Sequence, residues 1–341
     1  MKQVPPIIST DPLGDAADAL GAEGAADPAD ASELRPFTIP VAQHGERLDR
    51  VLAEVIPEFS RNYLRQLIEA GAVSLRGAAV TKPSTTVRAG EPGQIELRPT
   101  PQSQAFRPEA MPIRVVYEDQ HLRVVDKPAG LVVHPAPGHW SGTLLNGLLA
   151  LDARAAQLPR AGIVHRLDRD TSGLMVVARS RQAMDALVAL IAARDVSRQY
   201  VALAHRAWQG APARHVDAPI GRDPRNRLRM AVVDLARHAG KPARTLIERV
   251  DGSDDSCLVR CTLETGRTHQ IRVHMASIGH PLLADTLYGG VAAAGLERQA
   301  LHAFKLSFRH PVSGALLQFR SDPPPDLRLA IEAMGLDYNR A

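Results

Sequence analysis

The stretch RAGIVHRLDRDTSGLMVVARS, residues 160–180, constrains the fold most, because two apolar runs enclose a polar segment. The runs at 163–164 and 174–178 predict a strand on each side of a polar loop. Two Asp and two Arg lie within 166–170, followed by a small-residue turn at 171–173. Neighbouring cations hold a carboxylate ionised, and such a carboxylate can act as a nucleophile. A solvated loop with weak ion pairs is the alternative that residue types alone leave open.

Charge divides the chain into an acidic start and a basic remainder. Residues 1–34 contain one Lys and seven Asp or Glu, and they show no apolar periodicity, so we expect a disordered acidic tail. Because the whole chain has a formal charge of +4, the net −6 of this tail leaves +10 for residues 35–341. A basic body favours a polyanionic partner, either nucleic acid or an anionic membrane.

The apolar segments argue against export or a membrane. The longest run, 184–193, is shorter than the roughly 20 residues that a membrane span needs. The first thirty residues lack the apolar core of a signal peptide. We therefore expect a cytoplasmic protein.

Cysteine and histidine spacing argues against a disulfide and a metal. Cys257 and Cys261 lie in an alternating segment that predicts a strand. On a strand their α-carbons would be about 13 Å apart, too far for a disulfide, so we expect core thiols in a reducing compartment. The thirteen His have no ligand cluster at metal spacing, and no Gly-rich nucleotide loop is present. We expect neither a metal nor another cofactor.

Residues 35–98 predict a small basic α/β unit. Leu48, Leu52 and Val55 have helical spacing, and a second helix is expected between an N-cap at Ser60 and Gly71. Short strands at 72–75 and 94–97 follow.

The motifs R-L-D-x-x-L, S-R-x-x-x-x-x-L-I-x-x-G-x-V and a K-P turn resemble the small RNA-binding domain shared by a small-subunit ribosomal protein and tyrosyl-tRNA synthetases. The resemblance implies phosphate contacts around the start of the second helix. Ordinary solvated helix faces are the alternative. The candidate RNA-binding residues are Arg47, Ser60, Arg61, Asn62, Arg65 and Lys82.

Residues 99–112 are Pro-rich and predict an interdomain linker. A second domain, 113–341, follows. In its first strands, Asp126 and Lys127 precede a Pro-Ala-Gly turn. Spacing alone allows them to be active-site groups, but we favour a structural role that sets this turn against the polar loop. Residues 205–249 are basic and irregular, which indicates either a phosphate-contacting face or a solvated insertion.

Two further segments offer site residues. In SRQYVAL, Tyr200 faces away from Val201 and Leu203, so it is either half exposed or lines a cleft. In ETGRTHQIRVHMASI, the strand ends at a Thr-Gly turn, and Thr268 can cap a helix that buries its apolar residues. This arrangement places Arg267 at the mouth of the turn.

Together, HRLDRDTSG, SRQY and TGRTHQIRVH resemble, in this order, the motifs of pseudouridine synthases that act on ribosomal RNA. The resemblance covers residues 37–335 and is closest to the large-subunit type. It implies an α+β fold with a mixed, mainly antiparallel sheet and flanking helices, without metal or cofactor. The expected partner is large-subunit ribosomal RNA or the pre-ribosomal large subunit, and a monomer is the default state.

The resemblance also assigns roles to residues. Asp168 would be the catalytic nucleophile, Arg267 its salt-bridge partner, and Tyr200 a stacking residue and candidate proton acceptor. Arg166 would fill the gap left by a flipped base, beside an apolar wall at Ile271. A sister synthase with other RNA targets would share these motifs, and an RNA-binding assembly factor without catalysis is the competing class.

Overall fold

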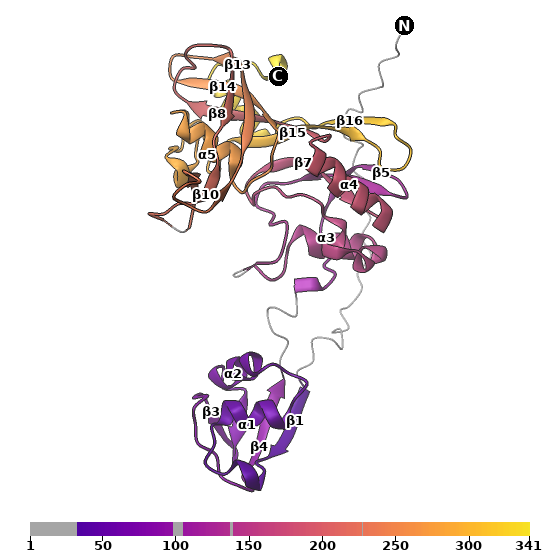
Figure 1. Ribbon diagram of the computed structural model, residues 1–341, viewed down its shortest axis with the longest axis vertical. Helices are drawn as coiled ribbons and strands as arrows, with labels where there is room; N and C mark the ends of the chain where they lie inside the picture. The colour runs from indigo at the N-terminus through magenta and orange to yellow at the C-terminus, as the bar shows by residue number, and fades with distance from the viewer. Residues whose placement is uncertain (1–32, 98–104, 137–138, 227) are drawn as a thin grey trace. The chain divides into compact units, whose positions relative to one another are not determined.

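The computed structural model describes residues 33–97, 105–136, 139–226 and 228–341. These residues form two compact units that divide after Ala105 (Figure 1). The predicted acidic tail lies outside the described residues except for Glu33 and Leu34.

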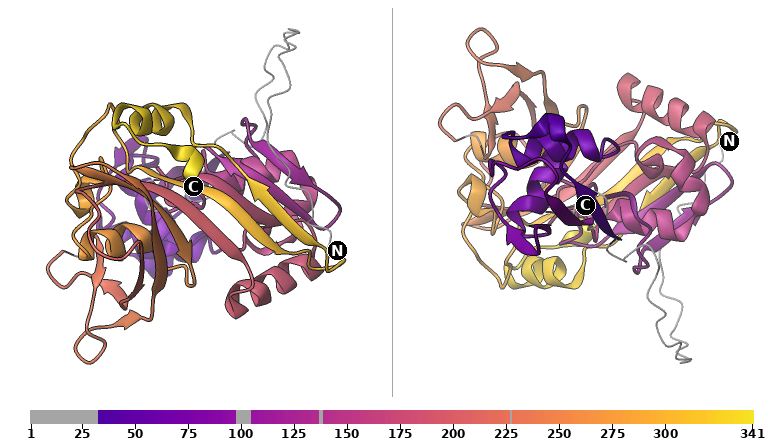
Figure 2. Two further views of the ribbon diagram at one scale, coloured as in Figure 1. Left: turned by 90° about the horizontal axis from the view of Figure 1, so that it is seen from above. Right: turned by 90° about the horizontal axis from the view of Figure 1, so that it is seen from below.

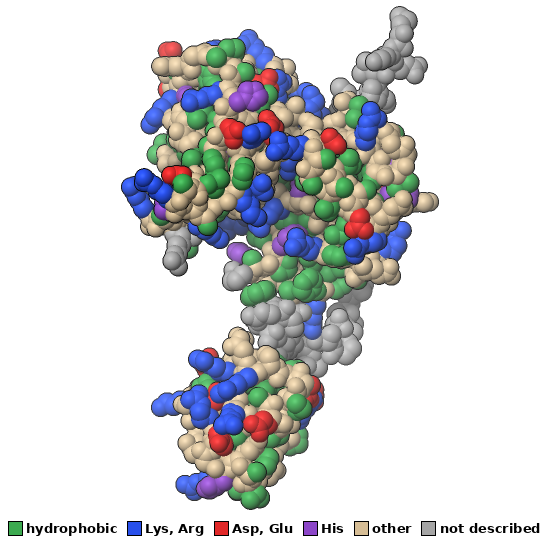
Figure 3. Space-filling model, viewed as in Figure 1, with side chains coloured by type: hydrophobic (Ala, Val, Ile, Leu, Met, Phe, Trp, Pro, Cys, Tyr) green, Lys and Arg blue, Asp and Glu red, His purple; other side chains and the backbone are tan. Residues whose placement is uncertain are grey.

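The smaller unit is a four-stranded antiparallel sheet covered by two helices. Its sheet order is β1-β4-β2-β3. Its elements are β1 (Glu33–Thr38), a 3-10 turn η2 (Val41–Gln43), α1 (Leu48–Val55), α2 (Arg61–Glu69), β2 (Val73–Leu75), β3 (Ala78–Val80) and β4 (Pro92–Leu97). Figure 3 shows Lys and Arg side chains gathered on the face of this unit that carries α2.

Local sequence signals in the smaller unit are confirmed. The Ser60 side chain accepts a hydrogen bond from the Tyr63 N–H at 3.3 Å and so caps α2. Gly71 follows the helix at φ +71°, where glycine is favoured. The strands β1 and β3 were missed: Glu33 and Leu34 of β1, assigned to the tail, pair with Leu97 and Glu96 of β4, and β3 pairs with β2.

The larger unit is built on one mixed sheet in the order β5-β6-β7-β15-β8-β14-β13-β9, with β16 paired to β15. All pairs in this sheet are antiparallel except β7 with β15. The strands are β5 (Arg114–Glu118), β6 (Leu122–Lys127), β7 (Ser172–Ala178), β8 (Ser197–His205), β9 (Ala213–Asp217), β13 (Arg244–Gly252), β14 (Ser256–Leu263), β15 (Leu301–Arg309) and β16 (Leu316–Arg320). The α+β class with a mainly antiparallel sheet is confirmed.

Helices and a small sheet surround these strands (Figure 2). The helices are α3 (Leu144–Leu151), α4 (Arg181–Ala193), α5 (Gln270–Ser277) and α6 (Pro325–Ala333), with short 3-10 turns η4 (Ala153–Gln157), η5 (Pro159–Gly162), η6 (Thr286–Tyr288) and η7 (Tyr338–Arg340). The small antiparallel sheet consists of β10 (Ile220–Arg222), β11 (Met230–Val232) and β12 (Gly240–Lys241). It includes part of the basic segment 205–249.

The two faces of the large sheet bury different apolar sets. One face packs against α3 and α5, and the other against α4 and α6. Along β8, Tyr200 belongs to the first set, whereas Val201 and Leu203 belong to the second, so the predicted alternation is confirmed. Cys257 and Cys261 are free, buried thiols on the same face as Tyr200.

The polar loop is anchored where it enters β7. Ser172 and Gly173 pair in parallel with His302 and Ala303 of β15. Gly173 has φ +115°, and a Cβ there would lie 2.3 Å from the Ala303 carbonyl oxygen. Glycine therefore permits the close approach that fixes the end of the loop.

Two predicted segments differ from the structure. The strand expected before the polar loop is reduced to a single bridge between Ile163 and Val177. Arg160 and Ala161 have positive φ, which interrupts an extended chain. Part of the predicted linker also packs on the larger unit, since the Glu109 N–H donates to the Asn146 carbonyl of α3.

Candidate active site

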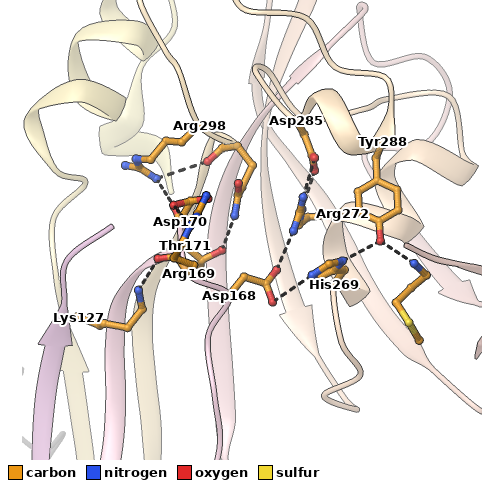
Figure 4. A network of polar contacts seen from close by, with 12 residues as sticks. Lys127, Asp168, Arg169, Asp170, Thr171, His269, Arg272, Asp285, Tyr288 and Arg298 are labelled. Atoms are coloured by element: carbon orange, nitrogen blue, oxygen red, sulfur yellow. Dashed lines mark hydrogen bonds and ion pairs between the residues drawn. The ribbon is translucent and has the colours of Figure 1, made fainter. Parts of the chain in front are cut away.

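Asp168 lies in the loop before β7 and is held by a buried arginine. Arg272, on α5, donates from Nη1 to Asp168 Oδ2 at 3.2 Å. The same guanidinium makes two hydrogen bonds of 2.8 Å to Asp285 (Figure 4). Burial opposes the charge of Arg272, but its hydrogen bonds to Asp285 raise its pKa above the usual value. A permanent cation thus forms an ion pair with Asp168.

The predicted salt bridge between Arg267 and Asp168 is wrong. Arg267 precedes α5, and its Nε donates to the Pro242 carbonyl at 3.0 Å. Arg272 lies inside α5, where its side chain is 8% exposed. Both arginines belong to the motif TGRTHQIRVH, so the sequence pointed to the correct segment and the wrong residue.

The predicted helix cap at Thr268 is also wrong. The N-cap position of α5 is His269, in the left-handed region at φ +57° and without a side-chain cap bond. The Gln270 side chain instead holds the turn before the helix, because its Oε1 accepts from the Arg267 N–H at 3.0 Å.

His269 faces the other oxygen of Asp168, and Tyr288 lies behind it. His269 Nε2 lies 3.9 Å from Asp168 Oδ1. On the far side of the ring, His269 Nδ1 and Tyr288 Oη are 2.8 Å apart, and the Met230 N–H donates to Oη at 3.1 Å. Burial lowers the pKa of His269, although the charge of Asp168 acts in the opposite direction. His269 was not among the predicted site residues.

Lys127 ties the turn after β6 to the Asp168 loop. Its ammonium donates to the carbonyls of Pro128, Leu131 and Arg169 at 2.8, 2.9 and 2.8 Å. Burial lowers the pKa of Lys127 to about 7, while three acceptors match the three donors of the protonated form. The expected role of Lys127, to set the turn against the loop, is confirmed.

The segment that leads into β15 holds the other side of the loop. Arg298 Nη1 donates to the Asp170 carbonyl at 3.0 Å, and Gln299 Nε2 donates to Thr171 Oγ1 at 3.3 Å. Ser172 Oγ lies 2.9 Å from His302 Nδ1. The loop is therefore fixed by elements from both ends of the larger unit, which keeps Asp168 in place before substrate binds.

His165, at the start of the polar loop, is a buried neutral base. Its Nε2 accepts from the Val176 N–H of β7 at 3.0 Å. Burial lowers its pKa to about 3, with a further contribution from the charge of Arg198. The ring therefore binds the loop to the strand in its uncharged form.

This burial predicts an acid-sensitive fold. An unfolded His titrates near 6.5, so between about pH 3 and 6.5 the unfolded chain binds the extra proton and stability falls as pH falls. The variant His165→Gln keeps an acceptor without the titration. We expect the unfolding free energy of the wild type to fall more steeply, by up to about 1.4 kcal/mol per pH unit. Denaturant unfolding between pH 4 and 6.5 measures both slopes, and parallel slopes would contradict the prediction.

Three further predicted residues, Tyr200, Ile271 and Arg166, belong to the larger unit. Tyr200 is 5% exposed, and burial raises its pKa to about 12, with Asp168 adding to the shift. Ile271 belongs to the same apolar cluster as Tyr200. Arg166 is exposed, and among the described residues its guanidinium has no ion-pair partner.

In the smaller unit, the buried carboxylate of Asp49 forms ion pairs with two of the predicted RNA-binding residues, Arg47 and Arg61. Asp49 accepts from Arg47 at 3.0 Å and from Arg61 at 2.8 Å. Burial opposes the charge of Asp49, but these hydrogen bonds lower its pKa below the usual value. Arg65 pairs with Glu69 one turn along α2. The other predicted residues, Ser60, Asn62 and Lys82, are exposed.

The described residues include no group of three or more His, Cys, Asp or Glu that could hold a metal ion. In the same part of the chain, no helix is long and apolar enough to cross a membrane.

Comparison with known proteins defines the class of this site. Residues 121–277, which contain Asp168, Tyr200 and Arg272, match the family model of RNA pseudouridylate synthases. Residues 46–92 match the S4 domain. The solved structure of human RNA pseudouridylate synthase domain containing 1 is 26% identical and covers 64% of this chain and 87% of its own, with a TM-score of 0.50.

Curated relatives narrow the class. The ribosomal large subunit pseudouridine synthase D of Xanthomonas campestris pv. campestris is 47% identical and covers 91% of this chain and 95% of its own length. The protein of the same name from Neisseria meningitidis serogroup B is 44% identical, over 88% of this chain and 82% of its own. The chain belongs to the pseudouridine synthase D family, and it is therefore an isomerase.

Proposed function

We propose that this enzyme converts specific uridines of large-subunit ribosomal RNA to pseudouridine, with Asp168 as the nucleophile. The observation that carries the proposal is the ion pair between Asp168 and a buried Arg272. The names of the relatives indicate ribosomal large-subunit RNA as the class of substrate. The basic body of the chain fits a polyanionic substrate.

The reaction needs a nucleophile and no second reactant. The bond between the ribose C1′ and the ring N1 breaks, a bond from C1′ to C5 forms, and the C5 proton is lost while N1 gains one. Attack on the ribose carbon and attack on the base ring both start from an ionised carboxylate. Arg272, itself held by Asp285, donates to Asp168 and keeps its carboxylate in one orientation.

Other residues would hold the uridine outside its stem, since the target base must leave the stack. The exposed Arg166 has a planar cation suited to fill the gap. Tyr200 and Ile271 offer ring and apolar contacts to the base. With a pKa of about 12, Tyr200 keeps its proton at neutral pH, which favours stacking over proton acceptance.

The smaller unit would bind RNA phosphates through the cations around the start of α2. Arg47 and Arg61 are held side by side by Asp49, and the first N–H groups of α2 add favourable dipoles. The proposal includes a cytoplasmic monomer that acts on free large-subunit RNA or on the pre-ribosomal particle.

Pseudouridine mapping tests the proposal. Purified wild type is incubated with large-subunit RNA, with the assembled subunit and with transfer RNA, and each uridine is scored. Conversion of defined uridines in large-subunit RNA is the expected result. Conversion only in other RNA would mean that the enzyme is a synthase of the same family with other RNA targets. RNA binding without any conversion would favour an assembly factor.

A further inference from the structure

One short segment, residues 285–288, supports both groups that face Asp168. Asp285 holds Arg272, which donates to Oδ2 of Asp168. Tyr288 contacts His269, which faces Oδ1. Figure 4 shows the two chains of contacts converging on the carboxylate. The first chain gives Asp168 a cationic partner at Oδ2, and the second leads to Oδ1 through His269.

The hydrogen-bond pattern and the nearby Asp168 carboxylate together favour one tautomer of His269. The Met230 N–H occupies one lone pair of Tyr288 Oη at 3.1 Å, and the hydroxyl hydrogen is then free for donation to His269 Nδ1 at 2.8 Å. A neutral imidazole that accepts at Nδ1 carries its proton on Nε2. This N–H points toward the Asp168 carboxylate, whereas the other tautomer would direct a lone pair at a negative charge.

The surroundings of His269 favour this arrangement. The charged groups that act on the ring are Asp168, Arg272, Asp285 and Arg166, and burial keeps the ring neutral. The guanidinium of Arg272 also lies over the Tyr288 ring, 5.0 Å from its centroid. The separation of 3.9 Å between Nε2 and Oδ1 is longer than a hydrogen bond, and such contacts tighten when substrate completes an active site.

We propose that His269 and Tyr288 are positioning residues for the Asp168 nucleophile: Tyr288 fixes the His269 tautomer, and His269 restrains Oδ1 while Arg272 restrains Oδ2. The strand β11 takes part, because its Met230 N–H donates to the Tyr288 hydroxyl oxygen. This inference deepens the proposed function and rests on it.

Hydroxyl removal tests the inference. Tyr288→Phe keeps the ring beneath Arg272 and deletes the donor to His269 together with the acceptor of the Met230 N–H. We expect kcat for uridine conversion to fall about tenfold, the equivalent of one hydrogen bond of about 1.4 kcal/mol, with the RNA KM unchanged within about twofold. Tyr117→Phe is the matched control, because Tyr117 also loses a hydroxyl bond, to Asp119 at 2.7 Å, but lies outside the site.

Substitution of His269 provides the second arm. The Gln side chain in His269→Gln can donate to Asp168 and accept from Tyr288, whereas His269→Ala can do neither, and both variants place a less tolerant residue at φ +57°. We expect the Gln variant to retain more kcat than the Ala variant. Because Tyr288 acts through His269, adding Tyr288→Phe to His269→Ala should cost no further activity.

The outcomes separate the inference from the function. Three results would overturn the positioning role. Tyr288→Phe could have the same kcat as Tyr117→Phe, or it could raise only the KM for RNA. In the double variant, the kcat losses of Tyr288→Phe and His269→Ala could also multiply. Asp168→Asn is assayed together with these variants. If the wild type converts uridine and Asp168→Asn does not, an unchanged kcat in Tyr288→Phe refutes this inference and leaves the proposed function intact. If wild type converts no uridine, both proposals fall.

Discussion

Asp168→Asn is expected to lower kcat by at least about 10⁴-fold, because an amide cannot replace an ionised carboxylate as a nucleophile. The substitution is nearly isosteric, so the loop contacts made by Lys127 and Arg298 remain. RNA affinity should change by less than about threefold, which separates chemistry from binding. Single-turnover conversion with saturating enzyme and a filter-binding titration measure the two quantities.

The matched control for this variant lies two residues away. The carboxylate of Asp170 pairs with the exposed Arg169 side chain, and the loop is held through the Asp170 carbonyl, which substitution leaves in place. Asp170→Asn should therefore keep kcat within about threefold of the wild type, since exposed ion pairs contribute little. Comparable losses in both variants would remove the assignment of Asp168 as nucleophile.

Arg272→Gln is expected to lower both activity and stability. It leaves Asp285, whose side chain is 1% exposed, as a buried charge without its partner, which costs about 3–5 kcal/mol of unfolding free energy. It also removes the cation beside Asp168, and we expect kcat to fall by about 10² to 10³-fold. Conversion assays below the transition temperature, together with denaturant unfolding, check both effects.

Arg267→Gln is the control from the same motif. Its side chain donates to a backbone carbonyl at the surface, so we expect a stability change of no more than about 0.5 kcal/mol and an unchanged kcat. A larger loss of kcat in Arg267→Gln than in Arg272→Gln would contradict the assignment of Arg272 as the partner of Asp168.

Local signals in the sequence were sufficient for many parts of the fold. The Ser60 cap and the two faces of β8 follow from spacing and turn residues, because those interactions join neighbours in sequence. The start of β7 was placed two residues late, since β7 begins at Ser172, inside the predicted turn. Lys127 was placed correctly from its position before a turn. The resemblance supplied the identity of Asp168 and Tyr200 as candidates.

The choice between two arginines could not be made in the same way. Residues 270–275 of α5 are all buried, so no amphipathic pattern separates an inward from an outward side. The partner that fixes Arg272 is Asp285, which follows after a turn and a loop. Such a pair is set by tertiary packing, and β1 was missed for the same reason, since its pairing with β4 joins residues about sixty positions apart.

The distant origin of the groups around Asp168 has a consequence for the order of events during translation. Arg272 follows Asp168 by 104 residues, and His302 follows Ser172 by 130. His302 is itself bound to the Ser321 carbonyl. At a synthesis rate of roughly 5–20 residues per second, Asp168 leaves the ribosome well before Arg272, which pairs with it, and before His302, which holds its loop. A growing chain therefore carries the HRLD loop without a working site, and it acquires activity only when its own synthesis is nearly complete.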